Sequence, residues 1–255
     1  MESKRKIIVG NWKMNPVGSS KALAIFKAIK KEHHSYKNID VIVAVPCVYL
    51  PVLKLLASKR LSLAAQNAFY EAAGPFTGEM AISMLQEVGA TAVIVGHSER
   101  RALGETNELI NKKVKAALKK NILPILCIGE STREDDVWYL HAVKSQLEEC
   151  LKDVKASELK SLVIAYEPLW AIGKDAKRVA TPIESEEMAI YIRKVLTDLF
   201  GARYAALPRI IYGGSVDEQN AQGFLYHGGV DGLLPGRVSL EPKKFLKILA
   251  MANEM

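Results

Sequence analysis

The sequence predicts an α/β protein whose residues 1–255 form a single domain, a closed (β/α)8 barrel. Two observations predict this fold. Eight short apolar runs recur along the 255 residues, and segments with helical spacing lie between them. With 49% hydrophobic residues the chain is long enough to bury one such core. No linker, charge block or low-complexity stretch divides it.

The strands of the barrel are expected at the apolar runs. Most of these runs are apolar on consecutive residues rather than on alternate ones, which is typical of parallel strands covered on both faces. In chain order the expected strands are Lys6–Val9, Val41–Val45, Leu61–Ala65, Thr91–Val95, Ile122–Ile128, Leu162–Ala165, Arg209–Tyr212 and Val230–Leu234.

Helices are expected where apolar residues recur three or four positions apart, and we interpret these stripes as core packing rather than as cofactor contacts. The stripes are Leu23, Phe26 and Ile29; Val52, Leu55 and Leu56; Ile110, Val114, Ala117 and Leu118; Val137, Leu140, Leu147 and Leu151; Ile192, Val195, Leu196 and Leu199; and Phe245, Leu246 and Leu249. An open doubly wound sheet is the alternative. The chain has neither G-x-G-x-x-G after its first strand nor G-x-x-x-x-G-K-[ST] anywhere, which favours the barrel.

Composition restricts the compartment and the partners. No apolar stretch approaches the length of a membrane span, and the apolar run after Lys6 is too short for a signal-peptide core. The three cysteines, Cys47, Cys127 and Cys150, lack metal-site spacing, so we expect a reduced, cytoplasmic protein without a membrane partner.

The net charge of +7 raises the question of nucleic-acid binding. The lysines lie mostly in helical stretches, mixed with acidic residues and without interleaved aromatic ones, which indicates solvated helix faces. We therefore expect no nucleic-acid partner. A positive field would instead draw in a small anionic substrate.

Chemistry-bearing residues follow five of the expected strands. In a (β/α)8 barrel the active site lies at the carboxyl ends of the strands, so these residues should meet at one rim. They are Asn11 and Lys13 after the first strand, His97 after the fourth, Glu167 after the sixth, Gly213, Gly214 and Ser215 after the seventh, and Pro235, Gly236 and Arg237 after the eighth. Each has an ordinary structural interpretation alone; their coincidence at separate strand ends favours a site. The other histidines, His33, His34, His141 and His227, lack ligand spacing and receive no role.

The segment after Glu167 suggests a catalytic base attached to a moving lid. It begins with Pro168, continues with the large apolar anchor Trp170 and ends in a small tip at Gly173. A lid of this kind would exclude water from the site when it closes.

Seven segments, in this order along the chain, resemble the triosephosphate isomerase family. They are Val9-Gly10-Asn11-Trp12-Lys13-Met14-Asn15, Ala65-Gln66-Asn67, Gly96-His97-Ser98-Glu99-Arg100-Arg101, Cys127-Ile128-Gly129-Glu130, Ala165-Tyr166-Glu167-Pro168, Trp170-Ala171-Ile172-Gly173 and Tyr212-Gly213-Gly214-Ser215. The resemblance implies a TIM barrel that interconverts dihydroxyacetone phosphate and D-glyceraldehyde 3-phosphate through an enediolate, in glycolysis and gluconeogenesis.

The resemblance also implies roles for individual residues. Glu167 matches the family's base and His97 its electrophile; this family is itself the known example of a neutral imidazole in that role. Lys13 would supply positive charge and Asn11 a positioning amide, and the Ser98 hydroxyl would hold the carboxylate of the base while the lid is open. The positions that match the family's phosphate contacts are Gly173, Ser215, Gly236 and Arg237. No metal and no organic cofactor is implied.

Two loops depart from the family pattern. After Gly173 the family continues into a short hinge, whereas this chain has an insertion at residues 174–180 before Thr181-Pro182. In the eighth loop Pro235 and Arg237 replace family residues; we expect the Arg237 side chain to face solvent and its backbone donor to remain.

Residues 66–80 resemble the family's interdigitating dimer loop. Phe76 at its tip would be exposed on a monomer, which argues for a partner. The resemblance implies a homodimer in which Thr77 reaches the neighbouring subunit's site. Two other interpretations stay open: a barrel isomerase for a larger phosphosugar, and an inactive barrel scaffold.

Overall fold

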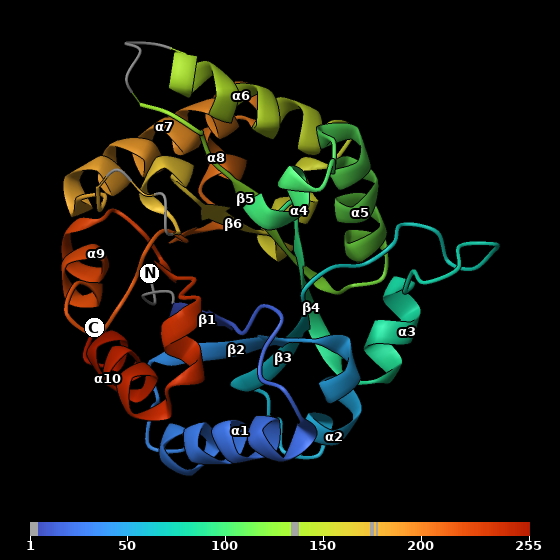
Figure 1. Ribbon diagram of the computed structural model, residues 1–255. Coiled ribbons are helices and arrows are strands. Elements are labelled where there is room, and N and C mark those ends of the chain that lie inside the picture. The colour runs from blue at the N-terminus through green and yellow to red at the C-terminus, as the bar shows by residue number, and fades with distance from the viewer. Residues whose placement is uncertain (1–4, 134–137, 174–175, 177) are drawn as a thin grey trace.

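The computed structural model describes residues 5–133, 138–173, 176 and 178–255, and its eight parallel strands form a closed barrel (Figure 1). The strands are β1 (Lys6–Asn11), β2 (Ile39–Val45), β3 (Leu61–Ala65), β4 (Ala90–Val95), β5 (Leu123–Ile128), β6 (Val163–Tyr166), β7 (Arg209–Tyr212) and β8 (Gly232–Leu233). Each strand pairs with its neighbours in sequence, and β1 closes the ring by pairing with β8 through Ile8 and Leu233. The predicted (β/α)8 fold is confirmed.

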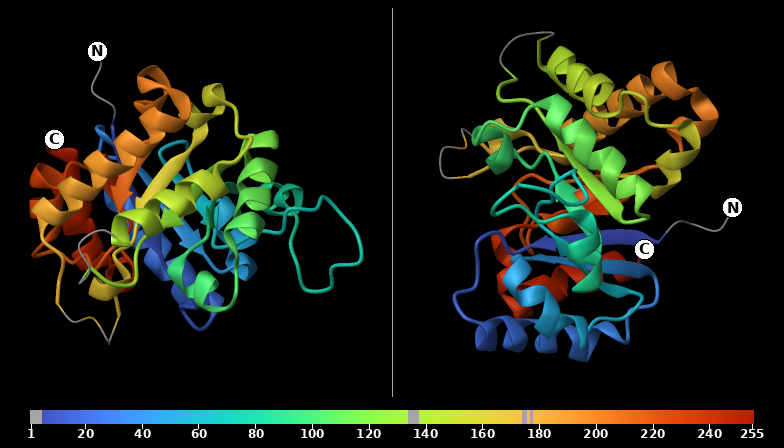
Figure 2. Two further views of the ribbon diagram at one scale, coloured as in Figure 1. Left: turned by 90° about the horizontal axis from the view of Figure 1, so that it is seen from above. Right: turned by 90° about the vertical axis from the view of Figure 1, so that its right-hand side faces the viewer.

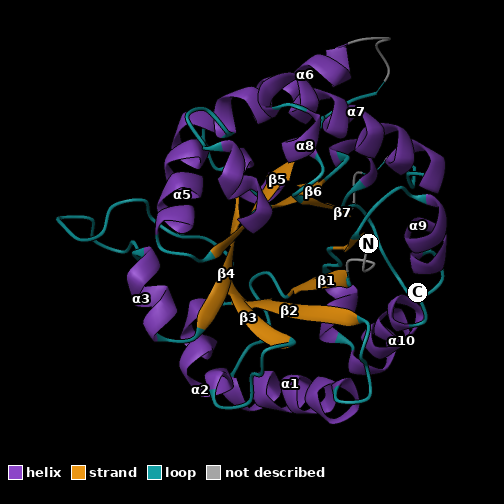
Figure 3. Ribbon diagram, turned by 180° about the vertical axis from the view of Figure 1, so that it is seen from behind, coloured by secondary structure: helices purple, strands orange, loops and turns teal. Residues whose placement is uncertain are grey.

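Helices surround the barrel on the outside (Figure 3). They are α1 (Ser19–His33), α2 (Leu50–Lys54), α3 (Ile82–Glu87), α4 (Ser98–Ala102), α5 (Asn107–Lys119), α6 (Trp138–Cys150), α7 (Pro182–Phe200), α8 (Ala202–Ala205), α9 (Ala221–His227) and α10 (Pro242–Asn253), with short 3₁₀ turns η1 (Cys47–Tyr49), η2 (Ala156–Ser161), η3 (Leu169–Ala171) and η4 (Arg237–Leu240).

Consecutive apolar residues in the strands serve two separate cores. Ile7 and Val9 point into the barrel, whereas Ile8 between them belongs to the layer between strands and helices. Small side chains such as Ala44 and Ala165 fill part of the interior, where space between the strands is limited. This two-sided burial explains why the strands show no alternation of polar and apolar residues.

Helix α7 shows how local sequence fixes an element next to the site. Thr181 caps its first turn: the Thr181 Oγ1 accepts the Glu184 N–H at 3.2 Å, and Glu184 Oε2 accepts the Thr181 N–H at 2.8 Å. Pro182 occupies the first helical position, where a missing N–H costs nothing. The helix ends at Gly201, whose φ of 83° is unfavourable for other residues.

Some expectations about helices were wrong. Leu55 is 84% exposed because α2 ends at Lys54, and Leu199 in the last turn of α7 is 39% exposed; neither belongs to the core. Helices α3 and α9 were not predicted, since six- and seven-residue helices present too few apolar positions to establish a period. Val137, placed in the fourth stripe, lies outside the described residues. Strand β8 is also shorter than the predicted Val230–Leu234.

The loop of residues 66–80 extends away from the barrel between β3 and α3 (Figure 2). At its base the Phe69 N–H donates to the Met80 carbonyl at 2.8 Å. The Phe76 ring lies 4.6 Å from the Phe69 ring and is 37% exposed. The expected exposed tip is therefore partly covered by the loop itself. None of the helices in the described residues combines the length and apolar character of a membrane span.

Candidate active site

A cleft of about 620 Å³ opens at the carboxyl ends of the strands. A cleft of this size is typical of small-molecule sites. Its lining includes most of the predicted site residues: Lys13, His97, Glu167, Gly173, Ser215, Gly236 and Arg237. Asn11 does not line the cleft and is only 4% exposed. The three side chains on which the predicted chemistry depends thus border one cavity.

Glu167 directly follows β6, and neighbouring glycines make room for it. Its N–H donates to the Ile128 carbonyl at 2.8 Å, which continues the β5–β6 ladder by one residue. A Cβ on Gly129 would lie 1.7 Å from the Glu167 carbonyl oxygen, and one on Gly213 would lie 3.0 Å from its Cγ. Only glycine at position 129 permits this close approach of backbone.

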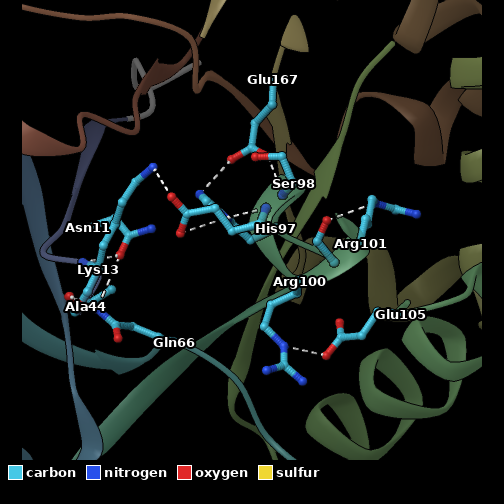
Figure 4. A network of polar contacts seen from close by, with 12 residues as sticks. Asn11, Lys13, Ala44, Gln66, His97, Ser98, Arg100, Arg101, Glu105 and Glu167 are labelled. Carbon is cyan, nitrogen blue, oxygen red and sulfur yellow. Dashed lines mark hydrogen bonds and ion pairs between the residues drawn. The ribbon is translucent and has the colours of Figure 1, made fainter. Parts of the chain in front are cut away.

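The Glu167 carboxylate is 2% exposed and contacts two residues at the start of α4 (Figure 4). Its Oε2 accepts the Ser98 N–H at 2.9 Å, and its Oε1 lies 3.3 Å from His97 Nε2. The expectation for Ser98 was therefore right about the residue and wrong about the atom, because the donor is the backbone N–H. A sequence cannot distinguish the two, since both belong to the same residue.

Hydrogen bonding defines the tautomer of His97. The Glu99 N–H donates to His97 Nδ1 at 3.2 Å, so Nδ1 is an acceptor without a proton. The ring proton of the neutral imidazole is thereby assigned to Nε2, the nitrogen beside Glu167. A neutral imidazole with this tautomer can donate a hydrogen bond into the cleft.

Lys13 occupies a strained backbone position that its neighbours support. Its φ is 53°, which is uncommon for residues other than glycine. Asn11 Oδ1 accepts the Lys13 N–H at 3.0 Å, and Gln66 Nε2 donates to the Lys13 carbonyl at 2.8 Å (Figure 4). Asn11, predicted as a substrate contact, thus supports the peptide that carries Lys13.

Lys13 Nζ forms an ion pair with Glu99 Oε1 at 2.6 Å. Glu99 was missed as a site residue, although it lies within the segment that carries His97. It contacts both Lys13 through its carboxylate and His97 through its N–H. Because Lys13 and Glu99 follow different strands, no spacing in the sequence reveals the pair.

The predicted phosphate contacts line the same cleft. Gly236 lies beside Lys13, since a Cβ on it would be 3.4 Å from Lys13 Cε. Arg237 is exposed and begins the 3₁₀ turn η4, where the first backbone N–H groups have no partner inside the turn. Ser215 Oγ donates to the carbonyl of Ala171, in the segment that was interpreted as a lid, at 2.8 Å. Such N–H groups, together with Lys13, suit an anion.

Two buried groups, one beside Glu167 and one beside Trp170, were not predicted. Burial, together with the neighbouring Glu167 carboxylate, raises the pKa of the Cys127 thiol well above its usual range, so Cys127 is neutral. Glu130 Oε1 accepts hydrogen bonds from Trp170 Nε1 and from the Tyr166 hydroxyl, both at 2.7 Å. Burial raises the pKa of Glu130 despite these donors. Glu130 therefore anchors Trp170, in the segment that was interpreted as a lid.

The insertion at residues 174–180 is described only in part. Residues 174, 175 and 177 lie outside the described residues, whereas Ala176 and the stretch 178–180 lie within them. Across the described ranges, no group of three or more His, Cys, Asp or Glu side chains is placed to hold a metal ion.

Comparisons with known proteins give one consistent result. The family model described as "Triosephosphate isomerase" matches residues 6–252. The chain is 40% identical over 252 residues to a protein of Dehalococcoides mccartyi named triosephosphate isomerase, and the match covers 98% of both chains. It is 40% identical to the protein of that name in Lactiplantibacillus plantarum, over 97% of this chain and 98% of the relative. A fungal relative of the same name, from Coprinopsis cinerea, is 39% identical over 92% of this chain and 93% of its own. With its barrel and its cleft, the chain belongs to the triosephosphate isomerase family.

Proposed function

We propose that this protein interconverts dihydroxyacetone phosphate and D-glyceraldehyde 3-phosphate, with Glu167 as the base. The observation that carries the proposal is the juxtaposition of the Glu167 carboxylate and His97 Nε2, 3.3 Å apart on the cleft wall. The reaction moves a proton between two adjacent carbons, one of which bears a carbonyl oxygen at each stage. A base and a hydrogen-bond donor side by side match that arrangement.

The proton transfer follows from the positions of the side chains. Glu167 turns from the Ser98 N–H toward the substrate and removes a proton from the carbon next to the carbonyl. The resulting enediolate carries negative charge on oxygen, which the Nε2–H of His97 and the ammonium group of Lys13 stabilise. A proton then moves from the hydroxyl oxygen on the first carbon to the oxygen on the second, and Glu167 returns its own proton to the second carbon.

The phosphate is the group that the cleft holds during this transfer. Gly236 and Arg237 at the start of η4, with Gly173 and Ser215, border the cleft, and Gly236 lies next to Lys13. Backbone N–H groups suit a dianion there, since they need no counterion and cannot titrate. Movement of Gly173 over the phosphate would exclude water and protect the enediolate.

We further propose a cytoplasmic homodimer in which residues 1–255 of each subunit form one barrel domain, acting in glycolysis and gluconeogenesis without a cofactor, a nucleic-acid partner or a membrane. The projecting loop 66–80 supports the dimer, because it carries exposed residues such as Thr77 away from the barrel. Other exposed apolar side chains, Met14 at 92%, Val17 at 93% and Val48 at 71%, follow β1 and β2. Their exposure suits a covered interface.

An assay of the purified protein tests this function. D-Glyceraldehyde 3-phosphate is supplied, and formation of dihydroxyacetone phosphate is coupled to its reduction by NADH. The expected result is rapid turnover that 2-phosphoglycolate inhibits competitively, with Glu167→Gln inactive and an exposed control, Glu254→Gln, fully active. A folded protein without turnover would refute the proposal, and turnover of a larger phosphosugar alone would favour the larger-substrate barrel.

A further inference from the structure

Arg178, in the lid insertion, joins the two ends of the lid to the barrel. It lies beyond the lid tip at Gly173, yet its side chain contacts Trp170 on the near side of the tip. It also contacts Glu184 in the first turn of α7. Nothing in the proposed chemistry uses this side chain.

The contact between Arg178 and Glu184 is a two-pronged ion pair. Arg178 Nη1 donates to Glu184 Oε2 at 2.9 Å, and Nη2 donates to Oε1 at 2.5 Å. The carboxylate is fixed from its other side, because its Oε2 also accepts the Thr181 N–H at 2.8 Å. Hydrogen bonding from Arg178, with further donors from Thr181, lowers the pKa of Glu184 to about 2. Arg178 is thus attached to a carboxylate that the cap of α7 holds in place.

The contact between Arg178 and Trp170 places a cation over the face of the indole. The guanidinium carbon lies 4.5 Å from the ring centroid, a favourable cation–π geometry. Trp170 is 8% exposed, and its Nε1 donates to Glu130. The indole is therefore held at its edge by Glu130 and on its face by Arg178.

We infer that Arg178 is a positioning residue that latches the lid in the arrangement in which Glu167 accepts the Ser98 N–H. This inference rests on the proposed function. Trp170 is three residues from Glu167, so a movement of the lid that shifts the indole is transmitted to the base. Since Arg178 is tied to α7, any such movement breaks the stack or the ion pair.

The latch opposes closure and so weakens ligand binding. A ligand that draws Gly173 over its phosphate must first release Arg178, and the free energy of that release reduces its affinity. A different role for Arg178 predicts the opposite change in ligand affinity. If Arg178 only added positive charge near the cleft, removing it would weaken the binding of a dianion.

The experiment measures the Kd of 2-phosphoglycolate by calorimetry for the full-length protein and for Arg178→Ala. The expected result is binding tighter by about threefold to tenfold, as an exposed ion pair and a cation–π contact would give, with a parallel fall in KM for D-glyceraldehyde 3-phosphate. Arg178→Lys retains the charge but loses the planar fork, so it should also bind more tightly than the wild type.

Arg203→Ala is the matched control. Arg203 stacks on Tyr204 at 5.7 Å in α8, which precedes β7 and so lies at the other end of the barrel from the cleft. The Arg203→Ala substitution removes the same charge and the same kind of contact without touching the lid. The Kd of 2-phosphoglycolate for this variant should equal that of the wild type. Equal or weaker binding by Arg178→Ala, or the same gain in Arg203→Ala, overturns the latch. If the wild type neither turns over triose phosphate nor binds 2-phosphoglycolate, the proposed function fails instead.

Discussion

The neutral imidazole of His97 places its Nε2 3.3 Å from Oε1 of Glu167. The Glu99 N–H fixes this orientation from the opposite edge of the ring. A proton donor and a proton acceptor thus meet at one point on the cleft wall, where they can address neighbouring atoms of a single substrate. The predictions about activity follow from this relationship.

Shortening the base should reduce turnover without affecting the fold. Glu167→Asp withdraws the carboxylate by one methylene, about 1.5 Å, and a misplacement of this order typically costs about 10²-fold in rate. We expect kcat to fall by about that factor, with an unchanged circular dichroism spectrum. If the folded Glu167→Asp protein kept the wild-type kcat, Glu167 would not be the base.

Replacing the electrophile should affect catalysis more than phosphate affinity. His97→Gln replaces the rigid imidazole donor, which the Glu99 N–H orients, with a flexible amide that is not fixed toward the developing oxyanion. Loss of one such oriented donor typically costs about 10²–10³ in kcat. The Kd of inorganic phosphate should change far less, because His97 lies at the Glu167 side of the cleft. An equal loss in both quantities would mean that His97 serves binding rather than catalysis.

Crowding the Glu167 side chain with a larger residue at position 213 should reduce kcat less than shortening that side chain does. A Cβ at position 213 would lie 3.0 Å from Glu167 Cγ and 3.3 Å from the Tyr166 carbonyl oxygen, so the Glu167 side chain must shift by a few tenths of an ångström. For Gly213→Ala we expect a loss of about tenfold in kcat, less than for a full ångström of displacement. Gly223→Ala in α9, whose Cβ would approach only Pro182 Cγ at 3.2 Å and which does not line the cleft, controls for the substitution itself. Equal kcat values in the two variants would contradict this account of Gly213.

The sequence was informative wherever a residue follows a strand directly. The barrel fixes the direction of each strand end, so a residue just past β1, β4 or β6 must lie at the same rim. Lys13, His97 and Glu167 could therefore be assigned to one rim from the sequence alone. The same reasoning places Gly236 and Arg237, which follow β8, at this rim.

What the sequence could not provide were contacts between different strand ends. The Lys13–Glu99 ion pair and the Gln66 amide beneath Lys13 depend on distances between separate loops. The donor to Glu167 is a backbone N–H of Ser98, which every residue except proline possesses. Leu55 was misassigned because its spacing matched a helix that ends one residue earlier.

A charge on the projecting loop should separate the proposed dimer. Thr77→Arg places a long cation at an exposed position of the loop 66–80 that is expected to insert into the partner. Sedimentation should show monomers, and activity should fall because the partner's loop no longer reaches the site. Ser157→Arg, at an exposed position of η2 outside this loop, should remain dimeric. An intact dimer of Thr77→Arg would refute the interface.

Acidification should destabilise the protein through His33, at the end of α1. His33 is 5% exposed, and its Nε2 is buried without a hydrogen-bond partner. Burial, with a contribution from Arg60, lowers the pKa of His33 below 6.5, against a smaller opposing effect of Asp40. The folded state therefore binds fewer protons than the unfolded state, so the free energy of unfolding falls as the pH drops below 6.5 and stops falling below the folded-state pKa.

His33→Phe keeps a ring beside Tyr36 but cannot take up a proton. Urea unfolding at pH 7 and pH 5, at one protein concentration, should show a smaller loss of stability for His33→Phe than for the wild type. The exposed neighbour His34→Phe should lose as much as the wild type, and equal losses in all three proteins would show that His33 does not carry the effect.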